Sequence, residues 1–600
     1  WNKTDFDDSK WRQAIVLEPE KGKLVAQQGP PLRVTKEIKP VKITSPSEGV
    51  YVVDMGQNFA GWAKLKVKGE KGTRVQLRFA ETLKPDGNVY RENLRKAKAT
   101  DVYILKGEGV EEWQPFFTYH GFRYVEVTGF PGKPTLDALT GMVAHSDAPN
   151  IGEFSCSNEL LDKVQHNIQW GQASNMYSVP TDCPQRDERL GWMGDAQAFA
   201  PTASYNMEMI NFFSKWMHDI SDGQDDDGAV HDVNPVIVVK GPAAPGWGDA
   251  VYVVPWVMYK FYGDKRILEQ NYDAIVGWVE YMRSKSKGNL YEQRGYGDWV
   301  AVEKSPSEPI GSAYYFYGAK MLSEMAKILG KNEDAIKYKK LSEKIAAAFN
   351  KKHFDSANNS YTGNTQTANL IPLNFGIVPK DHRKAVAANI IANVEEHNDH
   401  LTVGFLGVPL LLPTLSDYGY NDLAYKVASQ KTYPSWGYMV EKGATTIWEL
   451  WNGDTEGPGM NSRNHFALGS VGAWYYGYLA GIRPTPKAPG FKKVILAPMP
   501  ADGLDWAKAN VKTTYGEVSS YWQRKGNNIE YDFTVPANTS AVFHLPFLGK
   551  NIKSVSESGV AVYKNGQLIP TEGIGLIDNN DKEAVVSLAA GKYHFVVEYE

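Results

Sequence analysis

The segment Thr181–Asp195 concentrates side chains that could do chemistry. It holds four carboxylates, two guanidinium groups and one tryptophan, set among two glycines and a proline. A buried core would not tolerate so many charges, and a plain surface loop would not need the tryptophan beside them. Pro184, Gly191 and Gly194 interrupt regular structure, so the segment is predicted to be a loop. Apolar residues then recur at helical spacing, and Asp195 is predicted to be the N-cap of that helix.

These carboxylates have two interpretations. In the first, they belong to a solvated acidic loop and pair with Arg186 and Arg189. In the second, a carboxyl group held against Trp192 is partly desolvated, so its pKa rises and it can act as a general acid at neutral pH. The tryptophan favours the second interpretation, because carbohydrate sites combine carboxylates, which bind hydroxyls, with rings that stack on the C–H face of a sugar.

Hydrolysis of a glycoside needs a second carboxyl group on the other side of the scissile bond. The best candidate is Glu449, which lies between Trp448 and Trp451 in the glycine-bounded segment Gly443–Asp454. The competing interpretation is a glutamate that flanks a helix among core tryptophans.

Three more aromatic segments suit a sugar-stacking wall, because a tryptophan next to glycine fits poorly in a helix interior. They contain Trp247, Trp299 and Trp436. His465 follows Glu449 closely enough to share its cleft, although a lone histidine is more often a capping or core residue.

Composition excludes several classes of protein. The net charge is −4, from 65 basic and 69 acidic side chains in 600 residues. The sequence therefore has no excess of positive charge that would favour binding to nucleic acid or to an anionic membrane. The longest apolar runs are far shorter than a membrane helix. Cys156 and Cys183 are interpreted as ordinary thiols, with a single disulfide between them left open. No His/Cys cluster predicts a metal, and the chemistry above requires no cofactor.

The pattern of the chain divides it into four parts. Residues 1–23 resemble a remnant or linker of a preceding domain, and residues 24–150 show short alternating runs typical of a β-sandwich. Residues 151–484 contain about a dozen helical segments joined by aromatic, glycine-rich loops, which favours an α/α toroid over a β/α barrel. In residues 485–600 polar and apolar residues alternate again, and this pattern predicts a second β-sandwich.

The string DCPQRDERLGWMGD at residues 182–195 resembles the signature of the bacterial α-L-rhamnosidases of glycoside hydrolase family 78. Further segments look like motifs of the same family, and the resemblance covers nearly the whole chain. They are Asp54–Trp62, Phe117–Tyr124, Thr402–Pro409, Tyr433–Tyr438, Ala444–Glu449 and Ser462–Gly469.

The resemblance implies an (α/α)6 toroid flanked by N-terminal and C-terminal antiparallel β-sandwich domains. It also implies hydrolysis of terminal non-reducing α-L-rhamnosyl residues from glycosides or polysaccharides with inversion, Glu188 being the general acid and Glu449 the general base. The implied substrate-binding residues are Asp182, Arg186 and Asp195 for the sugar hydroxyls, and Trp192, Trp247, Trp299 and His465 for the pocket wall. Because inversion leaves room for a water, the two carboxyl groups are expected about 6.5 to 9.5 Å apart.

Two rival functions remain open at this point. One is another α/α-toroid glycosidase or a polysaccharide lyase, although a lyase would normally use a Tyr or His base. The other is a catalytically silent carbohydrate-binding protein with the same aromatic pocket. The leaving group, the linkage and the oligomeric state are also open, with a homodimer among the alternatives. The chain begins at Trp1 rather than Met, which is compatible with a removed signal peptide or preceding domain, and we expect a periplasmic or secreted protein, with the cytoplasm as the alternative.

Overall fold

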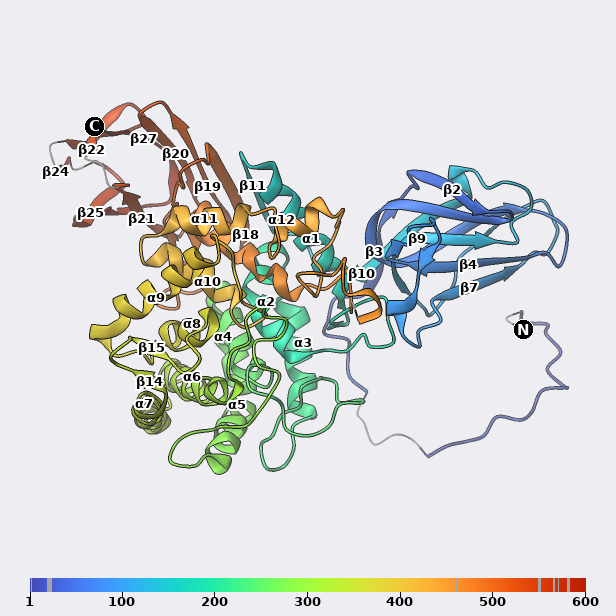
Figure 1. Cartoon of the computed structure of the whole chain (residues 1–600), viewed down its shortest axis with the longest axis horizontal. Helices are drawn as coiled ribbons and strands as arrows, with labels where there is room; N and C mark the ends of the chain where they lie inside the picture. Colours follow the sequence, from blue (N-terminus) through green and yellow to red (C-terminus); the bar gives the residue numbers. More distant parts are fainter. Residues whose placement is uncertain are drawn as a thin grey trace.

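The structure is a computed structural model that describes residues 1, 3–18, 24–459, 461–548, 552–564, 567–569, 571–579 and 583–599. Residues 3–18 contain neither helix nor strand, and their side chains are exposed. The predicted linker at 1–23 thus lies partly outside the described residues. Three parts follow along the chain, with the helical part in the middle (Figure 1).

The N-terminal part is a sandwich-like domain made from one curled antiparallel sheet of eight strands, ordered β1-β10-β3-β9-β4-β7 with β2 and β8 also paired to β3. Its core contains Phe59, Leu77 and Phe122, and these residues form a cluster separate from the core of the rest of the molecule. The strands are β1 Leu32–Ile38, β2 Lys42–Ser47, β3 Val50–Lys68, β4 Arg74–Ala80, β5 Thr82–Leu83, β6 Val89–Tyr90, β7 Thr100–Ile104, β8 Val110–Trp113, β9 His120–Thr128 and β10 Leu139–Ser146, with the short 3-10 helices η1 Glu92–Leu94 and η2 Leu136–Ala138.

The central part alternates amphipathic outer helices with almost fully buried inner ones, which is the sequence pattern of two concentric layers. The outer helices are α1 Glu159–Asn175, α3 Ile210–Asp222, α5 Lys265–Lys285, α7 Asn332–His353, α9 Arg383–Glu396 and α11 Asn421–Ser429. The inner helices are α2 Met193–Asn206, α4 Ala250–Tyr262, α6 Ser307–Ile328, α8 Gln366–Phe375, α10 Val408–Asp417 and a final segment built from η5 Ala467–Val471, α13 Gly472–Trp474 and the π-helical turn η6 Tyr475–Leu479.

Each inner helix contacts the next, and the final segment η5 returns to pack on α2, so the ring closes. The predicted (α/α)6 toroid is therefore confirmed. Local signals set the helix ends: the side chains of Asn158, Asp264 and Thr365 cap α1, α5 and α8, and Gly263 ends α4 with φ of 73°. A short helix, α12 Trp436–Glu441, and the small hairpins β12 Met176–Tyr177 with β13 Val179–Pro180 and β14 Phe354–Asp355 with β15 Ser360–Tyr361 complete this part.

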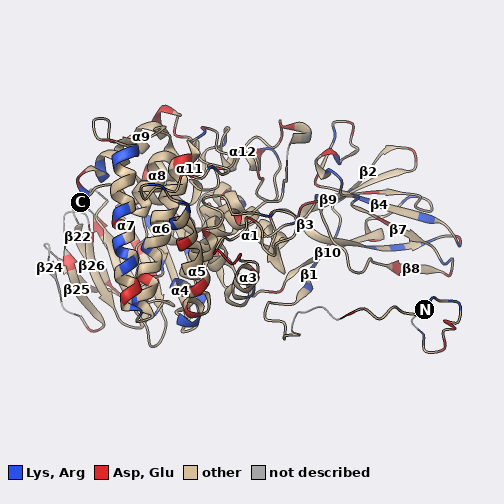
Figure 2. Ribbon diagram, turned by 90° about the horizontal axis from the view of Figure 1, so that it is seen from below, with Lys and Arg blue, Asp and Glu red and all other residues tan. Residues whose placement is uncertain are grey.

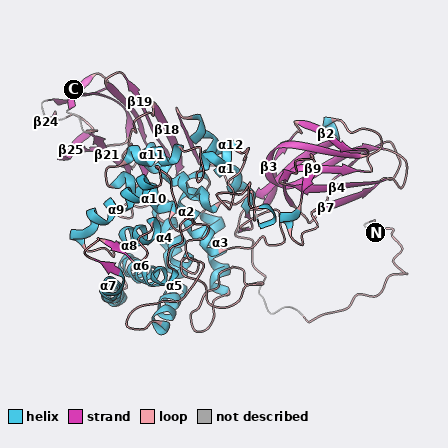
Figure 3. Cartoon of the chain, in the orientation of Figure 1, coloured by secondary structure: helices cyan, strands magenta, loops and turns pink. Residues whose placement is uncertain are grey.

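The C-terminal part is a sandwich of two sheets, ordered β11-β18-β19-β20-β27-β22-β23-β24 and β16-β17-β21-β26-β25. Phe533 and Phe543 join the sheets with ring centroids 4.8 Å apart. The strands are β11 Gly152–Cys156, β16 Ile482–Arg483, β17 Lys493–Leu496, β18 Trp506–Thr513, β19 Gly516–Lys525, β20 Asn528–Val535, β21 Ser540–Pro546, β22 Ile552–Glu557, β23 Val560–Lys564, β24 Gln567–Leu568, β25 Ile574–Asn579, β26 Glu583–Leu588 and β27 Gly591–Tyr599 (Figure 3).

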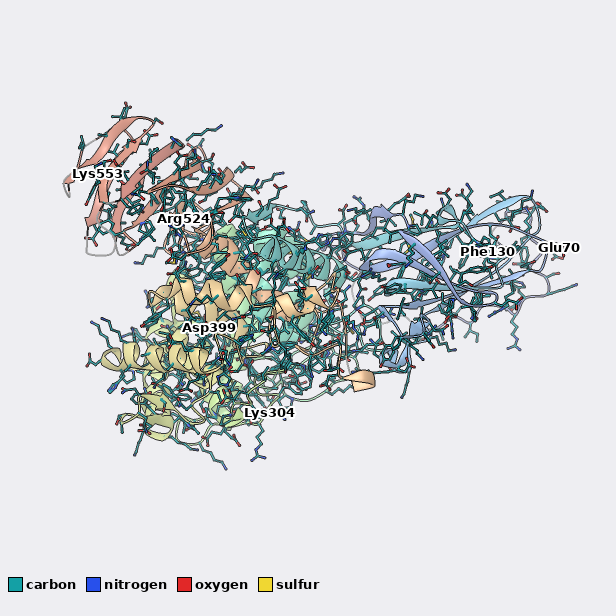
Figure 4. The ribbon with its side chains drawn as sticks, turned by 45° about the horizontal axis from the view of Figure 1, so that its top comes forward. Glu70, Phe130, Lys304, Asp399, Arg524 and Lys553 are labelled. Atoms are coloured by element: carbon teal, nitrogen blue, oxygen red, sulfur yellow. The ribbon has the colours of Figure 1, made fainter. Side chains whose placement is uncertain are left out.

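This C-terminal part continues the core of the toroid. One cluster of buried residues runs from α2 through η6 into the sheet, and the buried Trp522 donates its indole N–H to the carbonyl of Leu479 at 2.7 Å. Strand β11, which precedes α1, pairs with β18, so the first residues of the predicted helical range belong to the C-terminal sheet. Figure 4 labels Glu70 and Phe130 on the N-terminal sandwich, Lys304 on the toroid, and Arg524 and Lys553 on the C-terminal sandwich.

Two details of the sequence predictions were wrong. Helix α2 begins at Met193, so Asp195 lies in its first turn instead of at the N-cap. The C-terminal sandwich is not wholly antiparallel, because β17 and β21 pair in parallel. That pairing is possible because three strands of the other sheet separate β17 from β21 and provide the crossover.

Basic and acidic residues are interspersed over the toroid in the view of Figure 2, in keeping with the small net charge. Among the described residues, no helix is both long enough and apolar enough to cross a membrane. The described residues also contain no group of three or more His, Cys, Asp or Glu placed to hold a metal ion.

Candidate active site

Loops that lead from outer to inner helices meet at one end of the toroid and enclose a cavity of about 280 Å³. The loop between α1 and α2 supplies Asp182 to Trp192, and the loop after α12 supplies Glu449 and His465. The complete lining is Arg95, Asp182, Arg186, Glu188, Trp192, Asp195, Trp247, Tyr296, Trp299, Phe405, Glu449, Asn461 and His465.

The guanidinium of Arg186 joins the two glutamates across this cavity. Its Nη1 donates to Glu449 Oε2 at 3.0 Å, and its Nη2 lies 2.9 Å from Glu188 Oε2 and 3.1 Å from Asp182 Oδ2. The Arg186 side chain is only 3% exposed, so these charges interact with little screening. Two hydrogen bonds and the width of one guanidinium limit the separation of the bonded glutamate oxygens to roughly 8 Å.

Each glutamate has further partners. Glu188 Oε1 accepts the indole N–H of Trp192 at 2.8 Å, and Glu188 Oε2 also accepts Arg95 Nη1 at 2.8 Å. Glu449 Oε1 accepts from the Asn461 amide at 2.9 Å and lies 3.4 Å from Trp299 Nε1. Both side chains are thus held by hydrogen-bond donors on at least two separate loops.

The electrostatics of Glu449 suit a base. Burial alone would raise the pKa of Glu449, but the charges of His465 and Arg186 outweigh it and hold that pKa below its ordinary value. His465 responds in the opposite direction: burial would lower its pKa, but Glu449 and Asp195 raise it. At neutral pH the Glu449 carboxylate is therefore ionised and ready to accept a proton.

Asp182 and Asp195 form the polar floor of the site. Asp195 Oδ1 lies 3.0 Å from His465 Nε2, so the Nε2–H of His465 points at the Asp195 carboxyl group. Asp182 Oδ1 accepts the N–H of Leu190 at 2.8 Å. Burial raises the pKa of Asp182 to about 7, against the opposing charge of Arg186.

Aromatic rings form part of the cavity wall. Tyr296 lies at its centre, with ring centroids 4.8 Å from Trp247, 5.8 Å from Trp192 and 6.2 Å from Trp299. Its hydroxyl donates to Asp232 Oδ2 at 3.0 Å, which fixes the ring among the three tryptophans. Such a wall matches the apolar face of a sugar.

Two local features position this wall. Gly194 is the second residue of α2, and a Cβ there would lie 2.4 Å from the ring of Trp247, so only glycine lets that ring pack against the helix. Asp298, next to Trp299, is buried and accepts the backbone N–H groups of Gly404 and Leu406, both at 2.7 Å. That aspartate ties the Trp299 loop to the turn that carries Phe405.

Comparisons with known proteins follow the same division of the chain. Residues 149–479 match the bacterial α-L-rhamnosidase 6 hairpin glycosidase domain, residues 44–145 the concanavalin-like domain of these enzymes, and residues 481–559 their C-terminal domain. The chain belongs to the bacterial α-L-rhamnosidase family.

Its similarity to individual rhamnosidases is high over most of the chain. An α-L-rhamnosidase of Streptomyces avermitilis is 44% identical over 555 residues, which are 91% of this chain and 53% of the relative. A crystal structure of an S. avermitilis α-L-rhamnosidase complexed with L-rhamnose has a TM-score of 0.91 at 42% identity, covering 96% of this chain and 54% of that one. The structure of an α-L-rhamnosidase from Dictyoglumus thermophilum has a TM-score of 0.94 at 42% identity. The match covers 99% of this chain and 67% of that one. The chain spans 53 to 65% of the length of the curated rhamnosidases it matches.

The structure brings to this one cavity all nine residues that the family resemblance implied to be catalytic or substrate-binding. Trp436 was predicted to join the sugar-stacking wall and does not line the cavity: it is buried in α12, where its Nε1 donates to the carbonyl of Leu468. Ser435 caps α12 and turns the segment into a helix, which directs the ring into the core. Cys156 and Cys183 are buried free thiols, so the disulfide left open above is absent.

Sequence reasoning missed four residues that line this cavity. Tyr296, Phe405 and Asn461 each lie within or next to a segment already singled out, so proximity could have found them. Arg95 had no such signal, because it comes from the N-terminal sandwich and reaches the cavity only through the packing of two domains.

Proposed function

We propose that this protein hydrolyses terminal non-reducing α-L-rhamnosyl residues from glycosides or polysaccharides with inversion at the anomeric carbon. The observation that carries the proposal is the bridge from one buried guanidinium, Arg186, to the carboxylates of Glu188 and Glu449 in a ring-walled cavity. Family membership and the rhamnose complex of the S. avermitilis relative support rhamnose as the sugar.

In the proposed mechanism, Glu188 gives its proton to the glycosidic oxygen as the bond from that oxygen to the anomeric carbon breaks. Glu449 takes a proton from a water, whose oxygen forms the new bond on the opposite face of the sugar. The lowered pKa of Glu449 supports its role as the base. Asp182 and Asp195 provide acceptors for the sugar hydroxyls, and the aromatic wall provides an apolar contact for the 6-methyl group.

The first test is the release of p-nitrophenol from its α-L-rhamnoside. We expect Glu188→Gln and Glu449→Gln each to lower kcat/KM on the order of 10²- to 10⁴-fold, the usual contribution of a general acid or base. A silent binding protein would release no p-nitrophenol. A lyase would instead produce an unsaturated sugar that absorbs in the ultraviolet.

A second substrate separates the two roles. Fluoride leaves without protonation, so Glu188→Gln should retain most of its activity on α-L-rhamnosyl fluoride, whereas Glu449→Gln should lose it. If both variants lost activity equally on the fluoride, the assignment of Glu188 as the acid would be wrong.

A further inference from the structure

The cavity has a buried floor and a partly exposed mouth. The side chain of Glu449 is 4% exposed and that of Glu188 is 16% exposed, so the proposed base lies deeper than the proposed acid. Tyr296 and Trp299 are each 39% exposed and belong to the mouth. Because a general acid protonates the glycosidic oxygen, the leaving group is attached on the side of Glu188. It therefore extends out through the mouth.

A second hollow of about 690 Å³ adjoins this mouth. It is lined from the segments 295–307 and 450–461 and by Tyr433, and we call it the outer hollow. Tyr296, Trp299 and Asn461 line both the inner cavity and the outer hollow. The inner cavity, of about 280 Å³, holds the rhamnosyl residue under the proposed function. The outer hollow offers the leaving group more than twice that space beyond the mouth.

Two exposed rings line the outer hollow. Trp299 lies at the mouth, where its Nε1 is 3.4 Å from Glu449 Oε1. Tyr433 precedes α12, is 44% exposed and packs edge-on against Tyr438, with ring centroids 5.8 Å apart. Tyr438 is itself fixed, because its hydroxyl donates to Asp454 Oδ1 at 2.8 Å. A ring that is held in place and still exposed can stack on the C–H face of a sugar at little cost in conformational entropy.

Polar groups lie beside these rings. Ser305, Asn452 and Glu456 provide donors and acceptors for hydroxyl groups, and the Asn452 amide donates to Glu456. Among the described residues, the charged side chains that line the outer hollow are those of Asp298, Lys304 and Glu456. Asp298 is buried and bonded to backbone N–H groups, which leaves one exposed cation and one exposed anion. Rings, hydroxyl-binding groups and balanced charge together suit a neutral sugar better than a uronate.

We propose that the outer hollow binds the leaving group of the substrate, and that this leaving group is a neutral carbohydrate of at least two sugar units. One unit passes Trp299 at the mouth, and another stacks on Tyr433. Tyr433 touches no reacting atom in this role, so it is a specificity-determining residue and not a catalytic one. The inference rests on the proposed function and adds to it the class of leaving group.

The test compares kcat/KM for leaving groups of different length. The substrates are α-L-rhamnosyl fluoride, p-nitrophenyl α-L-rhamnoside and a trisaccharide in which rhamnose is linked to a neutral disaccharide. In Tyr433→Ala, kcat/KM for the trisaccharide should fall about tenfold, because one stacking contact in the transition state is lost. The values for the fluoride and the p-nitrophenyl glycoside should stay unchanged, since these leaving groups are too short to fill the second position.

Two variants control this comparison. Tyr433→Phe keeps the ring and should retain kcat/KM for the trisaccharide. Tyr420→Ala removes a tyrosine that is exposed to nearly the same degree, 45%, and that lines neither the inner cavity nor the outer hollow. It should leave the hydrolysis of all three substrates unaffected. Equal thermal midpoints for the variants would exclude a folding effect.

A charged substrate tests the chemistry of the leaving group. The unchanged protein should hydrolyse the neutral trisaccharide with a higher kcat/KM than one whose last unit is a uronate, because the outer hollow has no excess of positive charge. The inference is overturned if Tyr433→Ala leaves kcat/KM for the trisaccharide unchanged, if it lowers kcat/KM for all substrates equally, or if the uronate-bearing trisaccharide is the better substrate. Absence of any rhamnoside hydrolysis by the unchanged protein would instead refute the proposed function.

Discussion

Arg186 and His465 together set the charge of the proposed base. Both lie within the same buried cluster as Glu449, and both lower the pKa of its carboxyl group against the effect of burial. A lone glutamate between tryptophans would have the opposite tendency and would be protonated more easily. The partners, more than Glu449 itself, therefore make this residue a base.

This balance predicts a shift in the acidic limb of the pH–rate profile. His465 has a raised pKa, so it is charged throughout the acidic range and helps to keep Glu449 ionised. In His465→Gln that charge is lost, the pKa of Glu449 rises, and the acidic limb of kcat/KM should move to higher pH by about one unit. His594→Gln, in the C-terminal sandwich, serves as the control and should leave the limb in place. An acidic limb at the same pH in His465→Gln would contradict this account.

At the scale of elements, the cavity depends on loops held by close packing and buried acceptors. The aromatic segments with Trp247 and Trp299 could be recognised from their adjacent glycines and aspartates, because those residues build the turns. Trp436 has the same neighbours in sequence, but the serine cap before it starts a helix that turns the ring inward. Sequence pattern therefore identifies a tight turn more reliably than it identifies the direction of the ring.

The contact between Gly194 and Trp247 gives a prediction at this scale. Gly194→Ala places a methyl group 2.4 Å from the ring, so the wall has to shift, and kcat/KM should fall on the order of 10- to 100-fold. Gly171→Ala in α1 is the matched control, because the nearest atoms to its Cβ lie at 3.9 Å. That control should keep full activity and an equal or higher thermal midpoint. Unchanged kcat/KM in Gly194→Ala would show that the wall does not depend on this contact.

At the scale of the whole molecule, the two β-domains differ in their relation to the toroid. The C-terminal sandwich shares one buried cluster with the helices, whereas the N-terminal sandwich has a core of its own. Alternating polar and apolar residues were sufficient to predict both sandwiches, and helical spacing was sufficient to predict the part between them. It could not predict the shared core or the reach of Arg95, since both arise from the docking of segments far apart in the chain.

Two leucine substitutions test this difference. Leu496→Ala in β17 and Leu77→Ala in β4 both truncate fully buried side chains, and each should cost about 2 to 5 kcal/mol within its own core. Leu496→Ala should lower the thermal midpoint at which the proposed rhamnoside hydrolysis is lost, because we expect the toroid to unfold together with the C-terminal sandwich. Leu77→Ala should lower the midpoint temperature of a separate calorimetric transition, the unfolding of the N-terminal sandwich. Equal thermal inactivation of the two variants would mean that all three parts unfold as one unit.

The central claim is that Glu188 and Glu449 act from opposite faces of one sugar, with a water between Glu449 and the anomeric carbon. The most direct measurement is proton NMR of the sugar first released from an α-L-rhamnoside, recorded before mutarotation. The account predicts that β-L-rhamnose appears first and the α-anomer follows slowly. Initial release of α-L-rhamnose would mean retention of configuration and would contradict the proposed pair.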